Sequence, residues 1–239
     1  MSDPVEGAGE EKRVTHWNAS EMEAAGAWGE KRRLAAAMRV VIERLMTSDA
    51  PEDELRAAAD ALERYAERLA RHPRADRYFG FAESANAGNV LAFFDQSPII
   101  GRANPIAPPV VMRAEGGRVV VGSARFGSAY EGPPGCVHGG WVAAAFDELL
   151  GFAQSLTGQG GMTGTLTVRY RKPTPLHTEL RLAARVDRVE GRKIFASGEI
   201  HAGELQTAEA EGIFISVDRA RFLALEEARQ RRIRERGAS

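Results

Sequence analysis

One segment, GCVHGGWVAAAFDELLGF at residues 135–152, restricts the fold more than any other part of this 239-residue chain. It is apolar at most positions, and its only acids are Asp147 and Glu148. The double glycine at 139–140 indicates a helix start, and the helical pattern continues to about Ser155. A helix that is apolar nearly all round has to be covered on most sides, and a curved sheet can cover it in this way.

The residues on either side of this helix have the pattern of strands. Two short runs joined by an EGG turn precede it, at 109–113 and 118–126. Longer runs with alternating apolar and polar residues follow it with short connections, at 163–172, 180–189, 193–203 and 206–218. We therefore predict an α+β domain over residues 109–218, in which a long central helix is wrapped by a curved antiparallel sheet.

The rest of the chain divides into three further parts. Residues 1–25 are polar and glycine-containing, and we predict that they are disordered. Residues 26–108 hold two amphipathic helices, predicted as a hairpin that packs on another part of the protein, and an irregular bridge. Ser48 or Asp49 can cap the second of these helices, and Pro51 suits its first turn. Residues 219–239 predict a charged C-terminal helix with a solvated face.

Composition excludes several classes of function. A net charge of -1 gives no electrostatic reason to expect a nucleic-acid partner. The single cysteine, Cys136, cannot form an intrachain disulfide, and the polar N-terminus has no signal-peptide core. The longest apolar run, residues 141–146, is too short to span a membrane. The histidines have no metal-ligand spacing, so we expect no metal site. Together these features predict a cytoplasmic protein with no cofactor and no membrane association.

The start of the apolar helix has the features of an oxyanion site. Gly139 and Gly140 lack Cβ atoms, so a ligand can approach the backbone N–H groups of the first turn. Those groups have no partner within the helix and carry the positive end of its dipole. They can stabilise the charge that develops on a thioester or ester carbonyl under attack, and His138 can donate a further hydrogen bond.

Asp147 is the candidate general base, because burial raises the pKa of a carboxylate. It lies about 10 Å along the helix from the glycines, at ~1.5 Å per residue. The side chain either leans back toward them or acts with a neighbouring subunit, and the sequence leaves both geometries open. A structural alternative pairs Asp147 with Arg169 or Arg171. Glu148 is expected to point toward solvent or an interface.

The HGG motif, Asp147 and the run GMTGTLTVRYRKPTPL together resemble the hotdog-fold acyl-CoA thioesterases, in the branch of the phenylacetate-pathway type and the animal long-chain enzymes. The resemblance covers residues 109–217. It implies a homodimer, possibly a tetramer of two dimers, whose sheets join into one and whose active sites form between subunits. The N-terminal helices and the bridge lie outside the minimal hotdog domain.

The resemblance also implies roles for individual residues. Asp147 matches the general base or nucleophile, Gly139 the glycine whose amide polarises the carbonyl, and His138 the histidine that positions it. Thr163 matches a threonine that orients the water or the acid. Three basic residues are candidates for the phosphates of coenzyme A: Arg169, Arg171 and Lys172. Trp141 is a candidate for lining the acyl pocket.

The predicted function is therefore hydrolysis of acyl-CoA thioesters to a free acid and CoA. A different class of function is a non-catalytic hotdog protein that binds acyl-CoA or lipid. A third hypothesis, hydration of enoyl-CoA by an Asp–His pair, is weaker because the longer signature of those enzymes does not occur in the chain.

Overall fold

The computed structural model describes residues 24–73, 95–108 and 110–216, and four positions between 224 and 231. The predicted disordered N-terminus and nearly all of the predicted C-terminal helix lie outside these residues, as does most of the bridge. Among the described residues, no helix combines the length and the apolar character that a membrane span requires.

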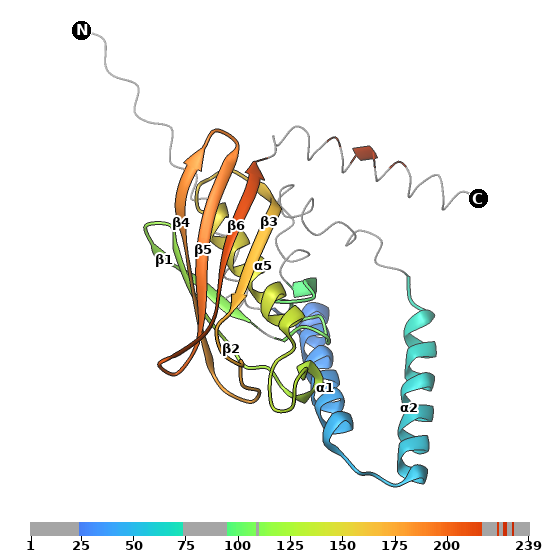
Figure 1. Ribbon diagram of the computed structural model, residues 1–239. Coiled ribbons are helices and arrows are strands. Elements are labelled where there is room, and N and C mark those ends of the chain that lie inside the picture. The colour runs from blue at the N-terminus through green and yellow to red at the C-terminus, as the bar shows by residue number, and fades with distance from the viewer. Residues whose placement is uncertain are drawn as a thin grey trace.

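Six antiparallel strands form a single sheet (Figure 1). In chain order they are β1 (Val111–Gly116), β2 (Val119–Ala124), β3 (Gly161–Tyr170), β4 (Leu180–Glu190), β5 (Lys193–Ala202) and β6 (Leu205–Ser216). Their order across the sheet is β1-β2-β4-β5-β6-β3, so β4, β5 and β6 form the predicted meander. The chain crosses over the sheet between β2 and β3, and this crossover contains the apolar helix.

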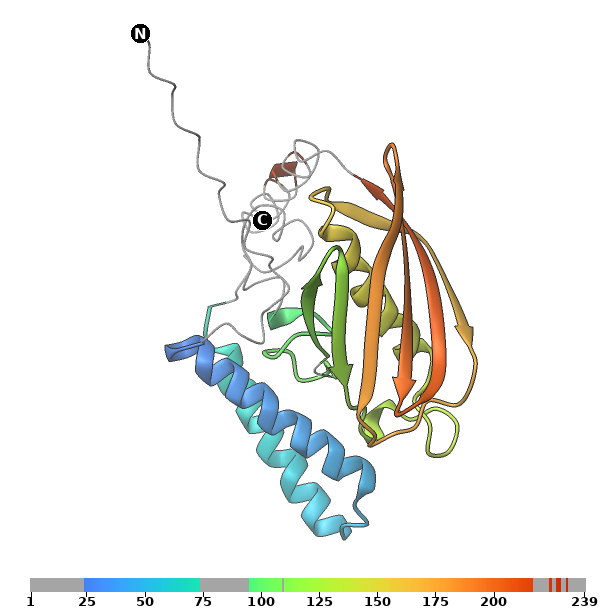
Figure 2. The ribbon, with the colours of Figure 1, turned by 90° about the vertical axis from the view of Figure 1, so that its left-hand side faces the viewer.

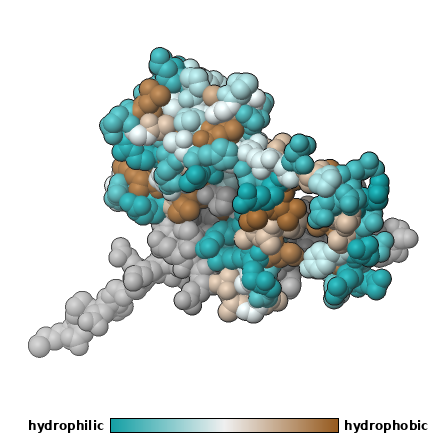
Figure 3. Space-filling view, turned by 90° about the horizontal axis from the view of Figure 1, so that it is seen from below, coloured by the Kyte–Doolittle hydropathy of each residue, from teal (hydrophilic) through white to brown (hydrophobic). Residues whose placement is uncertain are grey.

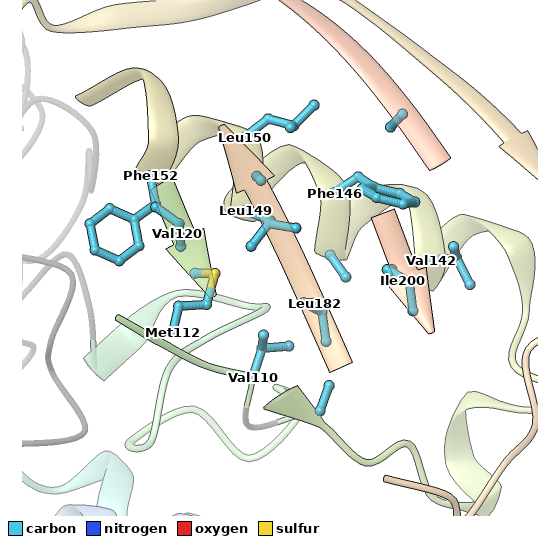
Figure 4. Packing of buried hydrophobic residues seen from close by; sticks show 14 of the residues in the cluster. Val110, Met112, Val120, Val142, Phe146, Leu149, Leu150, Phe152, Leu182 and Ile200 are labelled. Atoms are coloured by element: carbon cyan, nitrogen blue, oxygen red, sulfur yellow. The ribbon is translucent and has the colours of Figure 1, made fainter. Parts of the chain in front are cut away.

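That helix, α5 (Gly139–Ser155), lies against one face of the sheet (Figure 2). Its side chains Val142, Phe146 and Leu149 are fully or almost fully buried, and Figure 4 shows them among side chains from β1, β2, β4 and β5. The sheet approaches Leu150 closely at Gly198 and Gly212, where an added Cβ would lie 3.1 Å from a Leu150 methyl carbon. The predicted α+β hotdog fold is confirmed.

The edge strand β3 changes its alternation near its start. Tyr170 faces the same side as α5, whereas Arg169 faces away and pairs across the sheet with Glu209. The register shifts between Thr163 and Thr165, which indicates a bulge at Gly164. The bulge turns Thr163 toward α5, although strict alternation would place it on the far face with Thr165.

Two helices, α1 (Gly26–Thr47) and α2 (Glu52–Ala70), precede the sheet domain. The predicted cap at Ser48 or Asp49 is wrong, because the N-cap is Pro51 and no side chain caps the helix. The first turn of α2 instead carries three acids, Glu52, Asp53 and Glu54. Their negative charges stabilise the helix by interacting with the positive end of its dipole.

Polar side chains attach α1 to the sheet domain. Arg32 donates to Asp95, with its Nη2 2.8 Å from Oδ1, and the Asp95 side chain is completely buried. Arg39 Nη1 donates to the Asn104 carbonyl at 2.8 Å, and Glu43 accepts from the Ser128 amide and hydroxyl, each at 2.8 Å. These charge-assisted hydrogen bonds fix the side of α1 that faces the domain.

Much of the predicted apolar stripe of α1 therefore does not pack on the sheet domain. Met38, Val41 and Leu45 are exposed, because the face that docks carries Arg32, Arg39 and Glu43 instead. No residue of α2 is buried. Viewed from the end that carries α1 and α2, the surface shows hydrophobic side chains among hydrophilic ones (Figure 3).

Candidate active site

The N-terminus of α5 has one backbone N–H group left for a ligand. His138 is the N-cap, and its Nδ1 accepts from the Gly140 amide at 3.0 Å. The Trp141 and Val142 amides donate to the His138 carbonyl at 2.9 and 3.3 Å. Within the described part of the chain, the Gly139 amide has no acceptor. Gly139 is therefore the first-turn donor that a substrate carbonyl can use without displacing a cap.

The same cap determines what His138 can do. Because Nδ1 accepts a hydrogen bond, the proton of the neutral ring lies on Nε2. The His138 side chain is exposed, so Nε2–H can donate to a ligand beside the helix end. The capping role and the predicted positioning role are compatible, since they use different ring nitrogens.

Tyr170 supports the glycine from the sheet. Its hydroxyl donates to the Gly139 carbonyl at 2.8 Å, and an added Cβ on Gly139 would lie 3.3 Å from the Tyr170 Cζ. Sequence reasoning had identified Tyr170 only as one residue of an alternating strand. Its position on the α5 side of β3 was visible in that pattern, but its contact with the helix end was not.

Asp147 meets Thr163 and neither arginine. The Thr163 hydroxyl donates to Asp147 Oδ1 at 2.7 Å, and both residues are exposed. Arg169 and Arg171 bind other acids on β6, which excludes the structural pairing considered from the sequence. The expectation of a buried Asp147 is also wrong for the single chain, because this residue lies on the side of α5 that the sheet does not cover.

The side of α5 that carries Asp147 consists otherwise of small residues. Ala143, Ala144 and Gly151 lie within one turn of it and are only partly buried. The adjacent strand β3 pairs only with β6, so its other edge is unpaired within the described chain. Small side chains permit close approach of another backbone, and a long unpaired edge is a site for strand addition.

Gly139 and Asp147 of one chain lie far apart along α5. They are eight residues apart on a continuous helix, or about 12 Å along its axis at ~1.5 Å per residue. The Asp147 carboxylate also turns sideways to Thr163 on β3, not back toward the glycines. The two groups therefore lie at two separate places on α5 in the single chain.

Burial perturbs the neighbouring acid, Glu148. It accepts a hydrogen bond from the Ser97 hydroxyl at 2.8 Å, so the expectation that it reaches solvent or an interface is wrong. Burial raises its pKa to about 7, while the Ser97 hydrogen bond lowers the pKa and the Asp147 charge raises it. The two adjacent carboxyl groups thus have different environments, because they point to different sides of α5.

Glu148 makes stability depend on pH. Between its ordinary pKa of 4.5 and about 7, the folded chain holds a proton that the unfolded chain has released, so this stabilisation is present at low pH and lost as the pH rises toward 7. We expect Glu148→Gln to remove this loss, because glutamine stays neutral and can still accept from Ser97. From about pH 5 to about pH 8, the free energy of unfolding should fall by some 2–3 kcal/mol less in the variant. Urea denaturation at both pH values measures the free energy of unfolding. If it falls by the same amount from about pH 5 to about pH 8 in the variant and in the parent, the assignment of this pKa to Glu148 is contradicted.

The predicted substrate-binding residues lie in two different places. Arg169 Nη1 pairs with Glu211 at 2.8 Å, and Arg171 Nη2 pairs with Glu209 at 2.5 Å. Lys172 is exposed just beyond the end of β3. Trp141 lies on α5, two residues after Gly139, with its ring edge-on to Tyr130 at 5.0 Å between centroids.

A hollow of about 590 Å³ lies away from these groups. Its lining includes Arg113, Val121 and Arg181, which alternate with the core residues Met112, Val120 and Leu182 and so face away from α5. Among the described residues, no three His, Cys, Asp or Glu side chains are grouped so that they could hold a metal ion. The chemistry available at α5 is therefore that of a carboxylate, a hydroxyl, an imidazole and a backbone amide.

Thr163→Val provides a direct test of the Asp147–Thr163 pair. A hydrogen bond to a charged group contributes about 1.5–3 kcal/mol, so the thioester hydrolysis predicted from the sequence should fall by about tenfold to a hundredfold. Thr163→Ser retains the hydroxyl and is the matched control. Steady-state rates on one acyl-CoA measure both variants, and a valine variant as fast as the serine variant would exclude a role for this hydrogen bond.

Comparison with known proteins adds independent findings. Residues 134–209 match the family model described as the thioesterase superfamily. The acyl-coenzyme A thioesterase THEM4 of Xenopus laevis is 38% identical over 93 residues, which is 38% of this chain and 42% of that protein. THEM5 of Homo sapiens is 33% identical over 93 residues, 38% of each chain. The chain thus spans less than half the length of these relatives.

A solved structure covers more of the chain. Protein RHA08564, described as a thioesterase superfamily protein, is 33% identical in sequence with a TM-score of 0.69. The similarity extends over 77% of this chain and 94% of that one. A match of this extent is longer than the 76 residues of the family-model match and so includes residues outside it.

Proposed function

Because the chain belongs to the thioesterase superfamily, we propose that it hydrolyses acyl-CoA thioesters to a free acid and CoA. The observation that carries the proposal is the pair of half-sites on α5. One is the unoccupied amide of Gly139 at the positive end of the helix, and the other is the exposed Asp147 carboxylate held by Thr163. The names of the THEM4 and THEM5 relatives support acyl-CoA as the substrate class.

In the proposed reaction, Asp147 accepts a proton from water as the water oxygen bonds to the carbonyl carbon. The carbonyl oxygen becomes negative and accepts hydrogen bonds from the Gly139 amide and His138 Nε2. Collapse of the tetrahedral intermediate then breaks the carbon–sulfur bond. The proton held by Asp147 passes to the departing thiolate, which leaves the acid and CoA as products. Direct attack by Asp147 on the carbonyl is the alternative first step for the same residue.

We further propose that the site is completed by a second copy of the chain. The distance along α5 supports this, because Asp147 and Gly139 of one chain face different positions. The open edge of β3 and the small side chains beside Asp147 support it as well, since both would be covered by a partner. The proposed assembly is a homodimer with two sites, each using Asp147 of one subunit and Gly139 of the other, and two dimers can pair as a tetramer.

The finer assignments rest on the same motifs. Within the superfamily, we assign the chain to the branch of the phenylacetate-pathway type and the animal acyl-CoA thioesterases, acting in the cytoplasm. The basic residues Arg169, Arg171 and Lys172 are proposed contacts for the phosphates of CoA. Arg169 and Arg171 would have to exchange an acidic partner for a phosphate, whereas Lys172 is exposed beside them.

Thiol release from a panel of acyl-CoAs tests the function. The panel includes acetyl, hexanoyl, decanoyl, hexadecanoyl and phenylacetyl thioesters, with an enoyl thioester followed by its absorbance. Thiol release from at least one saturated thioester supports hydrolysis. Bound acyl-CoA that stays intact would favour the non-catalytic alternative, and loss of the enoyl absorbance without thiol would favour a hydratase.

A further inference from the structure

A hollow of about 330 Å³ separates α1 from the first turn of α5. Ile42 of α1 contributes one wall, Ile106 and Ala129 contribute others, and the rings of Tyr130 and Trp141 complete the lining. The volume lies at the lower end of the range for small-molecule pockets, roughly 300–1,000 Å³. Most of this lining is apolar, and the walls formed by Ile42 and Ile106 come from outside the minimal hotdog domain.

This hollow adjoins the proposed oxyanion site. Trp141 is two residues beyond Gly139, and the backbone carbonyl of Tyr130 accepts from the His138 amide at 2.9 Å. Two residues that line the hollow, Tyr130 and Trp141, are therefore hydrogen-bonded through their backbones to His138, which caps the helix. A thioester with its carbonyl at the Gly139 amide would therefore lie within a few residues of this hollow along the chain.

Three of the polar side chains around the hollow already have partners, whereas exposed Arg125 and the Trp141 indole N–H, which also line it, have no hydrogen-bond partner within the described residues. The Tyr130 hydroxyl donates to the Ile106 carbonyl at 3.0 Å, and burial raises its pKa to about 12, so it stays protonated. Arg39 donates to two backbone carbonyls, and Glu43 accepts from Ser128. Away from Arg125 and the Trp141 N–H, the amides of the pantetheine arm would lose hydrogen bonds to water without replacement here, whereas an alkyl chain would lose none.

Deepening the proposed thioesterase function and resting on it, we infer that this hollow is the binding site for the hydrocarbon acyl chain of the substrate. In this arrangement α1 is a specificity element, since Ile42 forms a wall that the sheet domain alone does not supply. The burial of successive methylene groups in the hollow favours longer chains until its end is reached.

Hydrogen bonds next to Ile42 hold its wall of the hollow in place. Glu43 lies one residue after Ile42 and binds both polar groups of Ser128. An added Cβ on Gly127 would lie 2.4 Å from Glu43 Oε2, so glycine at this position permits the close approach of α1. The hollow is thus a fixed feature of how α1 docks, as specificity for chain length requires.

Filling the hollow tests the inference. Ile106 is 53% exposed, so Ile106→Trp can project a larger side chain across the opening without disturbing the core. Val40→Trp is the matched control, because Val40 is 60% exposed on α1 and does not line the hollow. We expect Ile106→Trp to lower kcat/KM for decanoyl- and hexadecanoyl-CoA by roughly tenfold or more, with acetyl-CoA changed little. The Val40→Trp profile should follow that of the parent protein.

Calorimetric titration with the non-hydrolysable thioether analogue of hexadecanoyl-CoA separates this inference from the proposed function. Weaker binding to Ile106→Trp than to Val40→Trp would support the hollow as the chain site, whether or not the parent protein turns over a thioester. Equal binding and an unchanged chain-length profile would overturn the inference while leaving hydrolysis intact. A parent protein that binds no analogue and hydrolyses no acyl-CoA would overturn both.

Discussion

Replacing Asp147 with asparagine is expected to lower kcat for acyl-CoA hydrolysis by about 10²–10⁴, the usual contribution of a positioned acid or base. The substitution keeps the shape of the side chain, and the amide oxygen of asparagine can still accept a hydrogen bond from the Thr163 hydroxyl. It removes the group that takes the proton from water. Because the proton acceptor acts in the chemical step, KM should change far less than kcat. Thiol release under saturating acyl-CoA measures the loss.

The neighbouring acid gives a control for this experiment. Glu148→Gln removes a carboxylate from the same turn of α5, but its side chain points to Ser97 and not to Thr163. The variant should retain most of the hydrolysis at a pH below 7, where Glu148 of the parent is itself protonated. Asp147 is exposed in the single chain and asparagine keeps an acceptor for Thr163, so Asp147→Asn should change stability by only about 1 kcal/mol. An asparagine variant as active as the parent would exclude Asp147 as the base.

Local sequence patterns were sufficient to predict the architecture. The observed α5 runs from Gly139 to Ser155, as the double glycine and the apolar spacing indicated, because both signals act within a few residues. Strands β4, β5 and β6 agree with the alternating runs within about three residues. Alternating apolar and polar residues show that one face of each strand is buried. Together with one helix that is apolar nearly all round, this pattern predicts one curved sheet packed over one helix.

Contacts that depend on a local irregularity or on distant residues were beyond these patterns. Strict alternation places Thr163 on the far face of β3, and only the bulge at Gly164 turns it to Asp147. The role of Thr163 was expected from the family resemblance and not from its place in the strand. Glu148 was misplaced because Ser97, its partner, lies 51 residues earlier in an irregular segment.

The docking of α1 shows the same limit in a different form. Helical periodicity correctly predicted a helix with apolar residues along one face. It did not show that this face would be buried, and much of it is exposed. The arginines between the apolar residues carry the contact, since Asp95 and two backbone carbonyls of the bridge accept their hydrogen bonds. A sequence pattern cannot show which face docks when the partner surface offers acceptors and not apolar side chains.

Replacing Gly139 with proline is expected to lower kcat by about 10²–10³, the usual cost of removing one oxyanion donor. Proline suits the first position of a helix, so α5 should still form, but the ring nitrogen carries no proton to donate. The His138 backbone, at φ -59° and ψ 133°, already has the extended geometry that a residue before proline needs. Gly139→Ala is the matched control, because it keeps the N–H group and adds a Cβ 3.3 Å from the Tyr170 ring. An alanine variant as slow as the proline variant would show that crowding of Tyr170, and not loss of the donor, explains the effect.

Combining the two inactive variants distinguishes one shared site from two separate ones. If each site uses Asp147 of one subunit and Gly139 of the other, a mixed dimer of Asp147→Asn and Gly139→Pro chains contains one intact site. Unfolding and refolding the two chains together should then restore roughly a quarter of the parental rate, since half of the dimers are mixed and each has one working site of two. Restoration requires subunit exchange, so each variant refolded alone is the control and should stay inactive. A mixture that also stays inactive, with mixed dimers shown by differential tagging, would mean that both groups act within one chain.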